Sequence, residues 1–287
     1  MANFIMYGYS GDVDFAEVSL RALKRLQRPD ELIVFIDDAF EPVPDDFRHH
    51  IRNDLGVVYT QSNHPRRGNL IGPEHTIANI KYLNRYAELA KDGVCVKVDC
   101  DTLVLSRTWL DEFINDYTKS LAGGFHSQVN YMFGLCYAIK RGITQELLKD
   151  VEDNPPWIHC YEDYEISQRV HAKFPGLIRR FALAKPEASR WYCVNPQSIR
   201  PGARADVLDV NRGAERSLVL KVMTDTLNAA LEADKRNKQV QEEQKNEGTV
   251  DQICSVGLDE VCSRRDGEGA GGSVCEGQEQ LLLQDAR

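Results

Sequence analysis

Apolar residues recur along the first half of the chain in two different patterns. Short unbroken apolar runs alternate with longer segments in which apolar residues return every three or four positions. The runs predict strands at 3–9, 32–36, 57–59 and 94–105, and the periodic segments predict helices at 15–26, 47–55, 76–90 and 108–117. Strands that alternate with helices form a mostly parallel sheet covered on both faces. The pattern therefore predicts an α/β protein that binds its ligands at the carboxyl ends of the strands.

The second half of the chain is less regular. A strand is expected at 134–139, and helices are expected at 144–151 and from Glu162 onward. A last apolar stripe runs from Val219 to Leu231 and fades by Asp234, after which Gln, Glu, Lys and Gly dominate. We therefore expect one globular domain over residues 1–237 and an acidic, disordered tail over residues 238–287.

Charge and cysteine content narrow the classes of function. The 287 residues carry a formal net charge of −9, and residues 238–287 hold 11 acidic and 5 basic side chains, so −6 belongs to the tail and −3 to the rest. This balance argues against a protein that holds nucleic acid mainly by its phosphates. Five of the eight cysteines lie in or beside apolar stretches, where a free cysteine acts as a small apolar side chain. No segment reaches the roughly 18 apolar residues that span a bilayer, so we expect a soluble, cytoplasmic protein.

Two aspartates interrupt the apolar segment at 94–105. In an extended strand Asp99 and Asp101 lie on one side, and Lys97 shares that side. Neighbouring carboxylates repel unless a cation lies between them, and such oxygen ligands suit Mg²⁺ or Mn²⁺. Another Asp-x-Asp pair near the start of the chain is explained by a turn and a helix N-cap. At the end of a buried strand a divalent metal is the preferred hypothesis, with Lys97 either offsetting the negative charge or exposed to water.

Acidic pairs also follow a neighbouring strand and begin a later helix. Asp37 and Asp38 end the strand at 32–36, where their carboxylates either accept hydrogen bonds from a ribose or a base or stabilise the following loop. Glu162 and Asp163 lie at the head of a helix, where the helix dipole favours acidic side chains in any case. The pattern alone leaves both interpretations open for each pair.

Taken in order, these motifs resemble those of GT-A fold glycosyltransferases, and more particularly those of glycosyltransferase family 2. Residues 34–38 match the Asp-Asp pair that follows the second strand, and residues 96–101 match the Asp-x-Asp strand. Residues 133–141 match a glycine before an apolar strand that ends in basic residues, and residues 162–169 match the acidic motif on the acceptor side. Each match is short, but their common order covers about residues 1–180.

The resemblance implies a fold, an activity and roles for individual residues. The fold would be a three-layer α/β/α sandwich with a nucleotide-binding half and an acceptor-binding half. The activity would be the metal-dependent, inverting transfer of a sugar from a nucleotide-diphosphate donor to a hydroxyl of a glycan, a lipid or a small molecule. The implied donor-binding residues are Tyr7, Asp37, Asp38, Lys97 and Asp99, the implied ligands of Mn²⁺ or Mg²⁺ are Asp99 and Asp101, and the implied catalytic base is Asp163 with Glu162 beside it.

Two other classes of function are compatible with the same fold. Sugar-phosphate nucleotidyltransferases carry a glycine-rich loop with a basic residue after the first strand, and residues 7–12 lack both features. A non-catalytic module that binds nucleotide sugars would have lost the reaction, which the presence of Asp99, Asp101 and Asp163 argues against. The sequence leaves the donor sugar, the acceptor and the oligomeric state open.

Overall fold

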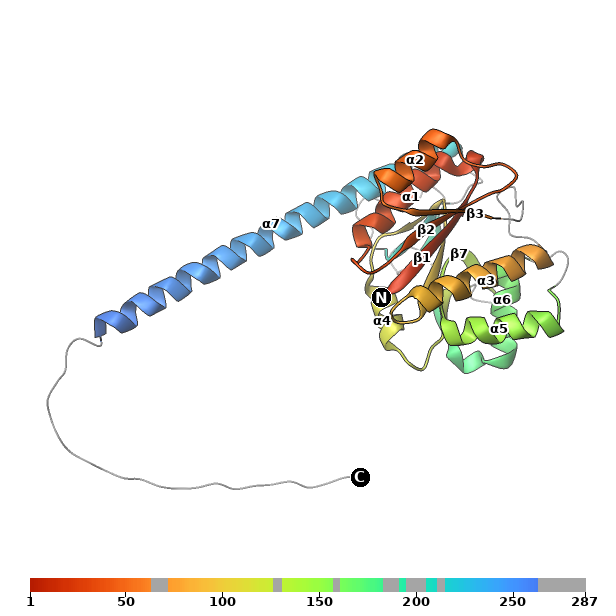
Figure 1. Ribbon diagram of the computed structural model, residues 1–287. Helices are drawn as coiled ribbons and strands as arrows, with labels where there is room; N and C mark the ends of the chain where they lie inside the picture. The colour runs from red at the N-terminus through yellow and green to blue at the C-terminus, as the bar shows by residue number, and fades with distance from the viewer. Residues whose placement is uncertain are drawn as a thin grey trace, which may run out of the picture. The chain divides into compact units, whose positions relative to one another are not determined.

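The chain folds around a central sheet of seven strands (Figure 1). The computed structural model describes residues 1–62, 72–125, 131–156, 161–182, 191–194, 205–210 and 215–262. The strands of this sheet are β1 (Ala2–Gly8), β2 (Ile33–Asp37), β3 (Val58–Gln61), β4 (Val94–Asp99), β6 (Leu121–Phe125), β7 (Met132–Lys140) and β8 (Ile178–Ala182). Their order is β3-β2-β1-β4-β7-β6-β8, and all neighbours are parallel except that β7 is antiparallel to β4 and β6. The predicted mostly parallel sheet is confirmed.

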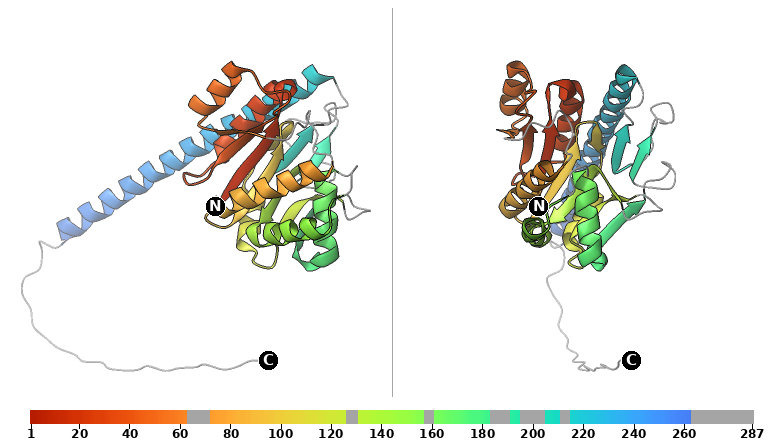
Figure 2. Two further views of the ribbon diagram at one scale, coloured as in Figure 1. Left: turned by 45° about the vertical axis from the view of Figure 1, so that its right-hand side comes forward. Right: turned by 90° about the vertical axis from the view of Figure 1, so that its right-hand side faces the viewer.

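Helices cover both faces of this sheet, which gives three layers (Figure 2). One face packs against α1 (Val13–Leu26), α2 (Asp45–Asn53) and α4 (Thr108–Asn115), and the other packs against α3 (Pro73–Leu89), α5 (Arg141–Asp153) and α6 (Glu162–Lys173). In β1, Phe4 and Met6 enter the first core, whereas Ile5 and Tyr7 enter the second. A strand that is buried on both faces reads as a mostly apolar run, as β1 does.

The segment at 94–105 forms two strands instead of the single interrupted strand that the sequence predicts. β4 ends at Asp99, and after a turn β5 (Thr102–Val104) joins a second, three-stranded sheet with β9 (Trp191–Val194) and β10 (Val207–Val210). β10 lies between the other two strands, antiparallel to β5 and parallel to β9. The turn at Cys100 and Asp101 therefore lies where the chain leaves one sheet for the other.

Gly123 and Gly124 belong to a strand that the sequence pattern does not predict. Both residues lie within β6, which pairs with β7 and β8. A Cβ added to Gly123 would come within 2.9 Å of the sulfur of Met132 in β7, so a glycine is needed for this close packing. A glycine usually weakens a strand, but Gly123 leaves room for the large side chain of Met132 on the neighbouring strand.

The last described helix is longer than the sequence predicts. α7 (Arg216–Cys262) runs through the expected domain boundary at residue 237, so residues 238–262 are helical where the composition predicts disorder; residues 263–287 lie outside the described part. Gln, Glu and Lys are good helix formers, so the fading apolar stripe marks the loss of core contacts and not the end of the helix. By its internal contacts the chain divides into two units, Met1–Asp234 and Lys235–Arg287. Of the helices described, none combines the length and the apolar character needed to cross a bilayer.

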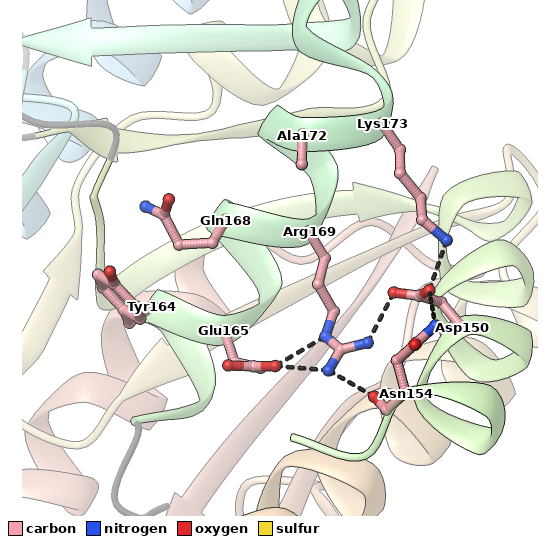
Figure 3. A pocket seen from close by; sticks show the side chains of 8 residues that line it. All are labelled: Asp150, Asn154, Tyr164, Glu165, Gln168, Arg169, Ala172 and Lys173. Atoms are coloured by element: carbon pink, nitrogen blue, oxygen red, sulfur yellow. Dashed lines mark hydrogen bonds and ion pairs between the residues drawn. The ribbon is translucent and has the colours of Figure 1, made fainter. Parts of the chain in front are cut away.

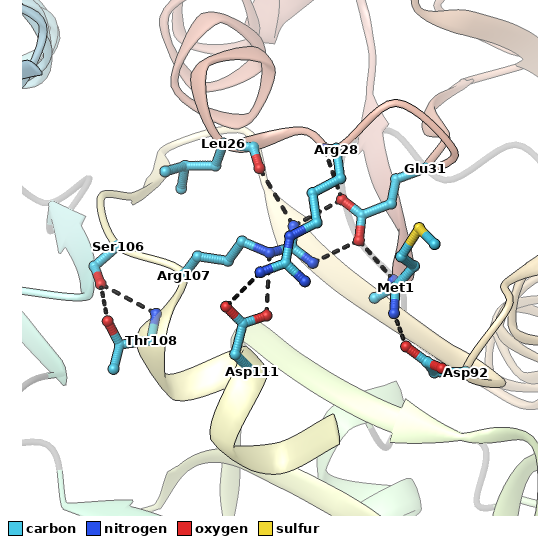
Figure 4. Close-up of polar contacts among 10 residues, drawn as sticks. Met1, Leu26, Arg28, Glu31, Asp92, Ser106, Arg107, Thr108 and Asp111 are labelled. Carbon is cyan, nitrogen blue, oxygen red and sulfur yellow. Dashed lines mark hydrogen bonds and ion pairs between the residues drawn. The ribbon is translucent and has the colours of Figure 1, made fainter. Parts of the chain in front are cut away.

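A network of ionic contacts joins the start of the chain to α4 (Figure 4). The Glu31 carboxylate accepts two hydrogen bonds from the guanidinium of Arg107, at 2.5 and 2.7 Å. It also accepts hydrogen bonds from the backbone N–H groups of Ala2 and Arg28. The side chain of Glu31 is 0% exposed and that of Arg107 is 11% exposed. This bidentate pair is therefore a structural contact that is largely shielded from water.

Replacing Arg107 by Met is expected to lower the free energy of unfolding by about 3 kcal/mol. This is the low end of the cost of breaking a buried ion pair, because Glu31 keeps its two backbone donors. The measurement is the unfolding midpoint in urea. The control is Lys149→Met, which breaks a pair with Glu146 whose side chains are 71% and 50% exposed and should cost less than about 1 kcal/mol. Equal midpoints for the two variants would contradict a stabilising role for the Glu31–Arg107 pair.

Candidate active site

Charged side chains from β4 and α6 meet where β4 ends. Lys97 of β4 donates hydrogen bonds to Asp99 Oδ1 at 2.6 Å and to the backbone carbonyl of Gly134 in β7 at 2.5 Å. Its Nζ also lies 3.4 Å from Oε1 of Glu162, the first residue of α6. The Lys97 side chain is 3% exposed and that of Asp99 is 39% exposed. Lys97 is thus a buried cation that joins the two elements, and Asp99 reaches the surface.

Burial and the neighbouring charges shift the pKa values of this cluster in opposite directions. Burial alone would lower the pKa of Lys97, but Asp99, Glu162 and Asp163 outweigh it and hold that pKa above its usual value. Burial raises the pKa of Glu162 to about 7, against the lowering effect of Lys97. Lys97 is therefore an ammonium at neutral pH. The sequence left open whether Lys97 offsets the carboxylate charge or is exposed to water. In the structure it is buried and offsets the charge.

Asp163 lies beside Glu162 in the first turn of α6 and is buried. Its Oδ1 accepts a hydrogen bond from the backbone N–H of Tyr164 at 2.7 Å, and its Oδ2 accepts one from the hydroxyl of Tyr131 at 3.2 Å. Burial raises the pKa of Asp163 above its usual value, and Lys97 opposes that rise. A carboxylate with a raised pKa is a stronger base, which suits proton transfer near neutral pH.

Gly134 gives Asp163 the space that it occupies against β7. A Cβ built on Gly134 would lie 2.7 Å from Asp163 Oδ2, closer than real Cβ atoms approach, and 3.2 Å from the Asp163 Cβ, which is a tight contact. The backbone carbonyl of the same glycine accepts a hydrogen bond from the Lys97 ammonium. The glycine that the sequence matches before this apolar strand therefore contacts both the cation and the carboxylate.

In the glycosyl transfer that the sequence resemblance implies, replacing Gly134 by Ala is expected to slow donor turnover on the order of 10²-fold, because an added methyl group must displace Asp163 and a displacement of about 1 Å at a reacting group costs that much. The measurement is the release of nucleoside diphosphate from a nucleotide sugar. Gly142→Ala in α5 is the matched control, because a Cβ there meets nothing within 4 Å. A Gly134→Ala protein that turns over donor at the wild-type rate would show that the position of Asp163 does not matter.

The two aspartates predicted to hold a metal lie at the turn between the sheets. Asp99 ends β4 with one oxygen bound to Lys97, and Asp101 is buried in the turn before β5. Among the residues that the structure describes, no three His, Cys, Asp or Glu side chains gather closely enough to ligate an ion. The two carboxylates fit Mg²⁺ or Mn²⁺ in the mode that uses one or two protein carboxylates and completes the shell with water and substrate phosphates. Metal binding at Asp99 and Asp101 stays a prediction. The predicted ion would bind together with the phosphates of the substrate.

Asp37 and Asp38, at the end of β2, make contacts within the protein. The Asp37 carboxylate accepts hydrogen bonds from the Tyr59 hydroxyl at 2.6 Å and from the backbone N–H of Val43 at 3.0 Å. Burial raises the pKa of Asp37, although these hydrogen bonds oppose the rise. Asp38 Oδ1 accepts from the backbone N–H of Phe40 at 2.8 Å, and both aspartates are 0% exposed. The structure thus shows both of them stabilising the loop after β2, and their contact with a nucleoside stays a prediction.

Tyr7 begins a chain of hydrogen bonds beneath the cluster. It is paired with Asp99 across the parallel strands β1 and β4, and its hydroxyl donates to Asn79 Oδ1 at 2.8 Å. Asn79 in turn donates to the hydroxyl of Tyr137 at 2.8 Å, and the ammonium of Lys97 lies 5.9 Å from the centre of the Tyr137 ring. This chain fixes side chains on α3, β1 and β7 around Lys97. The donor contact predicted for Tyr7 is not tested by this arrangement.

Comparisons with known proteins identify the fold. No family model matches the sequence, and no curated protein matches it. A glycosyltransferase, GlyE, from Streptococcus pneumoniae has a similar structure, with a TM-score of 0.51 and 14% identity over 83% of this chain and 63% of that chain. A galactosyltransferase, LgtC, has a TM-score of 0.48 and 13% identity over 79% and 95%. A cytidylyltransferase from Leptospira borgpetersenii has a TM-score of 0.43 and 12% identity over 67% and 79%.

The similarity to GlyE, together with the mostly parallel sheet between two helical layers, confirms the GT-A fold predicted from the sequence motifs. At these identities the comparison shows the fold alone, and membership of glycosyltransferase family 2 is not confirmed. This chain spans 63% of the GlyE chain. The chemistry must therefore be argued from the side chains themselves.

Proposed function

We propose that this protein is a glycosyltransferase that moves a sugar from a nucleotide-diphosphate donor to an acceptor hydroxyl. The observation that carries the proposal is the cluster of Lys97, Asp99, Glu162 and Asp163 at the carboxyl end of β4, in which all but Asp99 are buried. In open α/β sheets ligands bind outside the carboxyl ends of the strands, and burying carboxylates is costly for a protein that needs them only to fold. The GT-A fold, which this chain shares with the glycosyltransferase GlyE, supports the same reaction class.

On the donor side, Asp99 and Asp101 would face the diphosphate. When bound there, Mn²⁺ or Mg²⁺ would neutralise charge on the diphosphate leaving group. Lys97 is already paired with Asp99, so it holds that carboxylate in one orientation. Tyr7 is paired with Asp99 across β1 and β4, and it would help to position Asp99 toward the donor.

On the acceptor side, Asp163 would take the proton of the attacking hydroxyl. The Tyr131 hydroxyl and the Tyr164 N–H hold its two oxygens, and its raised pKa favours proton uptake. Glu162, whose pKa burial raises to about 7, is the alternative base, but its carboxylate faces the Lys97 ammonium at 3.4 Å, so we assign the proton transfer to Asp163. Attack from the side opposite the leaving diphosphate would invert the configuration of the anomeric carbon.

The test is to incubate the full chain with Mn²⁺ and a panel of UDP-, GDP- and CDP-sugars and to measure nucleotide release. We expect slow hydrolysis of one donor, and none after chelation of the metal. A parallel reaction with nucleoside triphosphates and sugar phosphates tests the alternative function. A sugar-phosphate nucleotidyltransferase would release pyrophosphate in that reaction. Pyrophosphate without donor hydrolysis would contradict the proposal, and so would the absence of both products.

A further inference from the structure

A cavity of about 490 Å³ lies along α6 and beside the end of α5 (Figure 3). Arg169 reaches from α6 toward α5 and donates to Asp150 Oδ2 at 2.6 Å, to Glu165 Oε1 at 2.6 Å and to the Asn154 carbonyl at 2.7 Å. Lys173 donates to the other oxygen of Asp150 at 2.5 Å. The polar side chains of the cavity are therefore held in place by one another before any ligand binds.

The charge of the cavity restricts the class of ligand. Among the described residues that line it, the cations Arg169 and Lys173 are matched by the carboxylates of Asp150 and Glu165, at ion-pair distances of 2.5 to 2.6 Å. Burial would raise the pKa of Asp150, but the hydrogen bonds from Lys173 and Arg169 outweigh it and lower that pKa, so the carboxylate stays ionised. A balanced set of paired charges gives little attraction for a phosphate or another anion.

The described lining also has an apolar part. It includes the Tyr164 ring and the methyl group of Ala172. Tyr164 is 42% exposed and projects, with Gln168, from the flank of α6 that faces away from α5 (Figure 3). An exposed aromatic ring beside fixed polar groups fits a neutral ligand that has both hydroxyl groups and apolar C–H faces.

Tyr164 connects this cavity with Asp163. Its backbone N–H binds Asp163 Oδ1, and its ring centre lies 5.7 Å from that of Tyr131, whose hydroxyl binds Asp163 Oδ2. Tyr131 in turn lies 5.0 Å from the Phe133 ring. Three aromatic rings thus pack next to one another beside Asp163, and one of them, Tyr164, lines the cavity.

We propose that the cavity along α6 binds a neutral sugar unit of the acceptor, and that the acceptor is an oligosaccharide. One unit lies against Tyr131 and Tyr164 with its hydroxyl toward Asp163, and the next unit occupies the cavity, where Gln168 and the Arg169 network supply hydrogen bonds. This inference rests on the proposed function and adds the class of acceptor to it.

The experiment measures binding of the full chain to an array of neutral monosaccharides, neutral oligosaccharides of two to five units and phosphorylated glycans. We expect the wild type to retain at least one oligosaccharide more strongly than its monosaccharides. Tyr164→Ala should weaken that binding about tenfold through loss of the aromatic contact, and Tyr164→Phe should restore it. The control is Lys149→Ala, an exposed change in α5 outside the cavity, which should bind as the wild type does.

Each outcome supports or overturns the inference. Retention of monosaccharides alone, of phosphorylated glycans alone, or of no glycan overturns it, as does a Tyr164→Ala protein that melts like the wild type and binds as tightly. Donor hydrolysis by the wild type is measured separately, because it requires no acceptor. A protein that hydrolyses a nucleotide sugar but retains no oligosaccharide fails this inference alone, whereas one that hydrolyses no nucleotide sugar fails the proposed function.

Discussion

Replacing Asp163 by Asn is expected to lower the rate of donor turnover by about 10²- to 10⁴-fold, the usual contribution of a positioned general base. The amide keeps the shape of the carboxylate and retains an oxygen for the Tyr131 hydroxyl or the Tyr164 N–H, but it cannot take up a proton. The measurement is the rate of nucleotide release with saturating donor. Nucleotide binding, measured by calorimetry with UDP, GDP or CDP in the presence of Mn²⁺, should survive the change.

The control for this variant is Asp153→Asn, which makes the same chemical change at an exposed position at the end of α5. Its rate should equal that of the wild type. If Asp163→Asn also turns over donor at the wild-type rate, Asp163 is not the base. The same assay on Glu162→Gln would then show whether the neighbouring carboxylate takes the proton.

Replacing Lys97 by Met is expected to lower the free energy of unfolding by about 3–5 kcal/mol, the cost of leaving buried charges without their partner. Lys97 is the cation that Asp99 and Glu162 share, and within the described part of the chain no hydrogen-bond donor satisfies Glu162 Oε1. Urea unfolding measures the loss. Lys221→Met, which breaks an exposed pair with Asp225, should cost less than about 1 kcal/mol.

A double-mutant cycle separates this charge effect from a simple loss of packing. Glu162→Gln removes the carboxylate that Lys97 neutralises, so the Lys97→Met change should cost less in that background, with a coupling energy above about 1 kcal/mol. Losses that add within about 0.5 kcal/mol would mean that Lys97 and Glu162 do not interact, and the cluster would lose its central contact.

The sequence predicts the parts of the fold that follow from local pattern. β1, β2 and β4 are buried on both faces and therefore read as mostly apolar runs, interrupted by Asn3 in β1 and Lys97 in β4, and α1 and α3 show a helical period. The pattern does not predict β6, because its glycines are needed for packing against Met132 on the neighbouring strand. The second sheet depends on pairing between β5 and β10, about 100 residues apart, which no local pattern reveals.

The sequence predicts the site in part. Asp99, Asp101, Glu162 and Asp163 stand out because acidic residues follow an apolar strand or begin a helix, and the structure brings Asp99, Glu162 and Asp163 together around Lys97. Tyr131 and the network around Tyr137 escape prediction, because an aromatic residue beside a strand looks like a core residue until its hydroxyl partner is known. Gly134 carries a signal, since it interrupts an apolar strand where no turn is needed.

The most direct test of the account is a crystal structure of the full chain soaked in turn with Mn²⁺ and UDP, GDP or CDP. We expect one nucleotide whose diphosphate lies beside Asp99 and Asp101, with the metal between carboxylate and phosphate oxygens and Asp163 facing the open side. A diphosphate bound away from the end of β4, or no bound nucleotide in any of the three soaks, would contradict it.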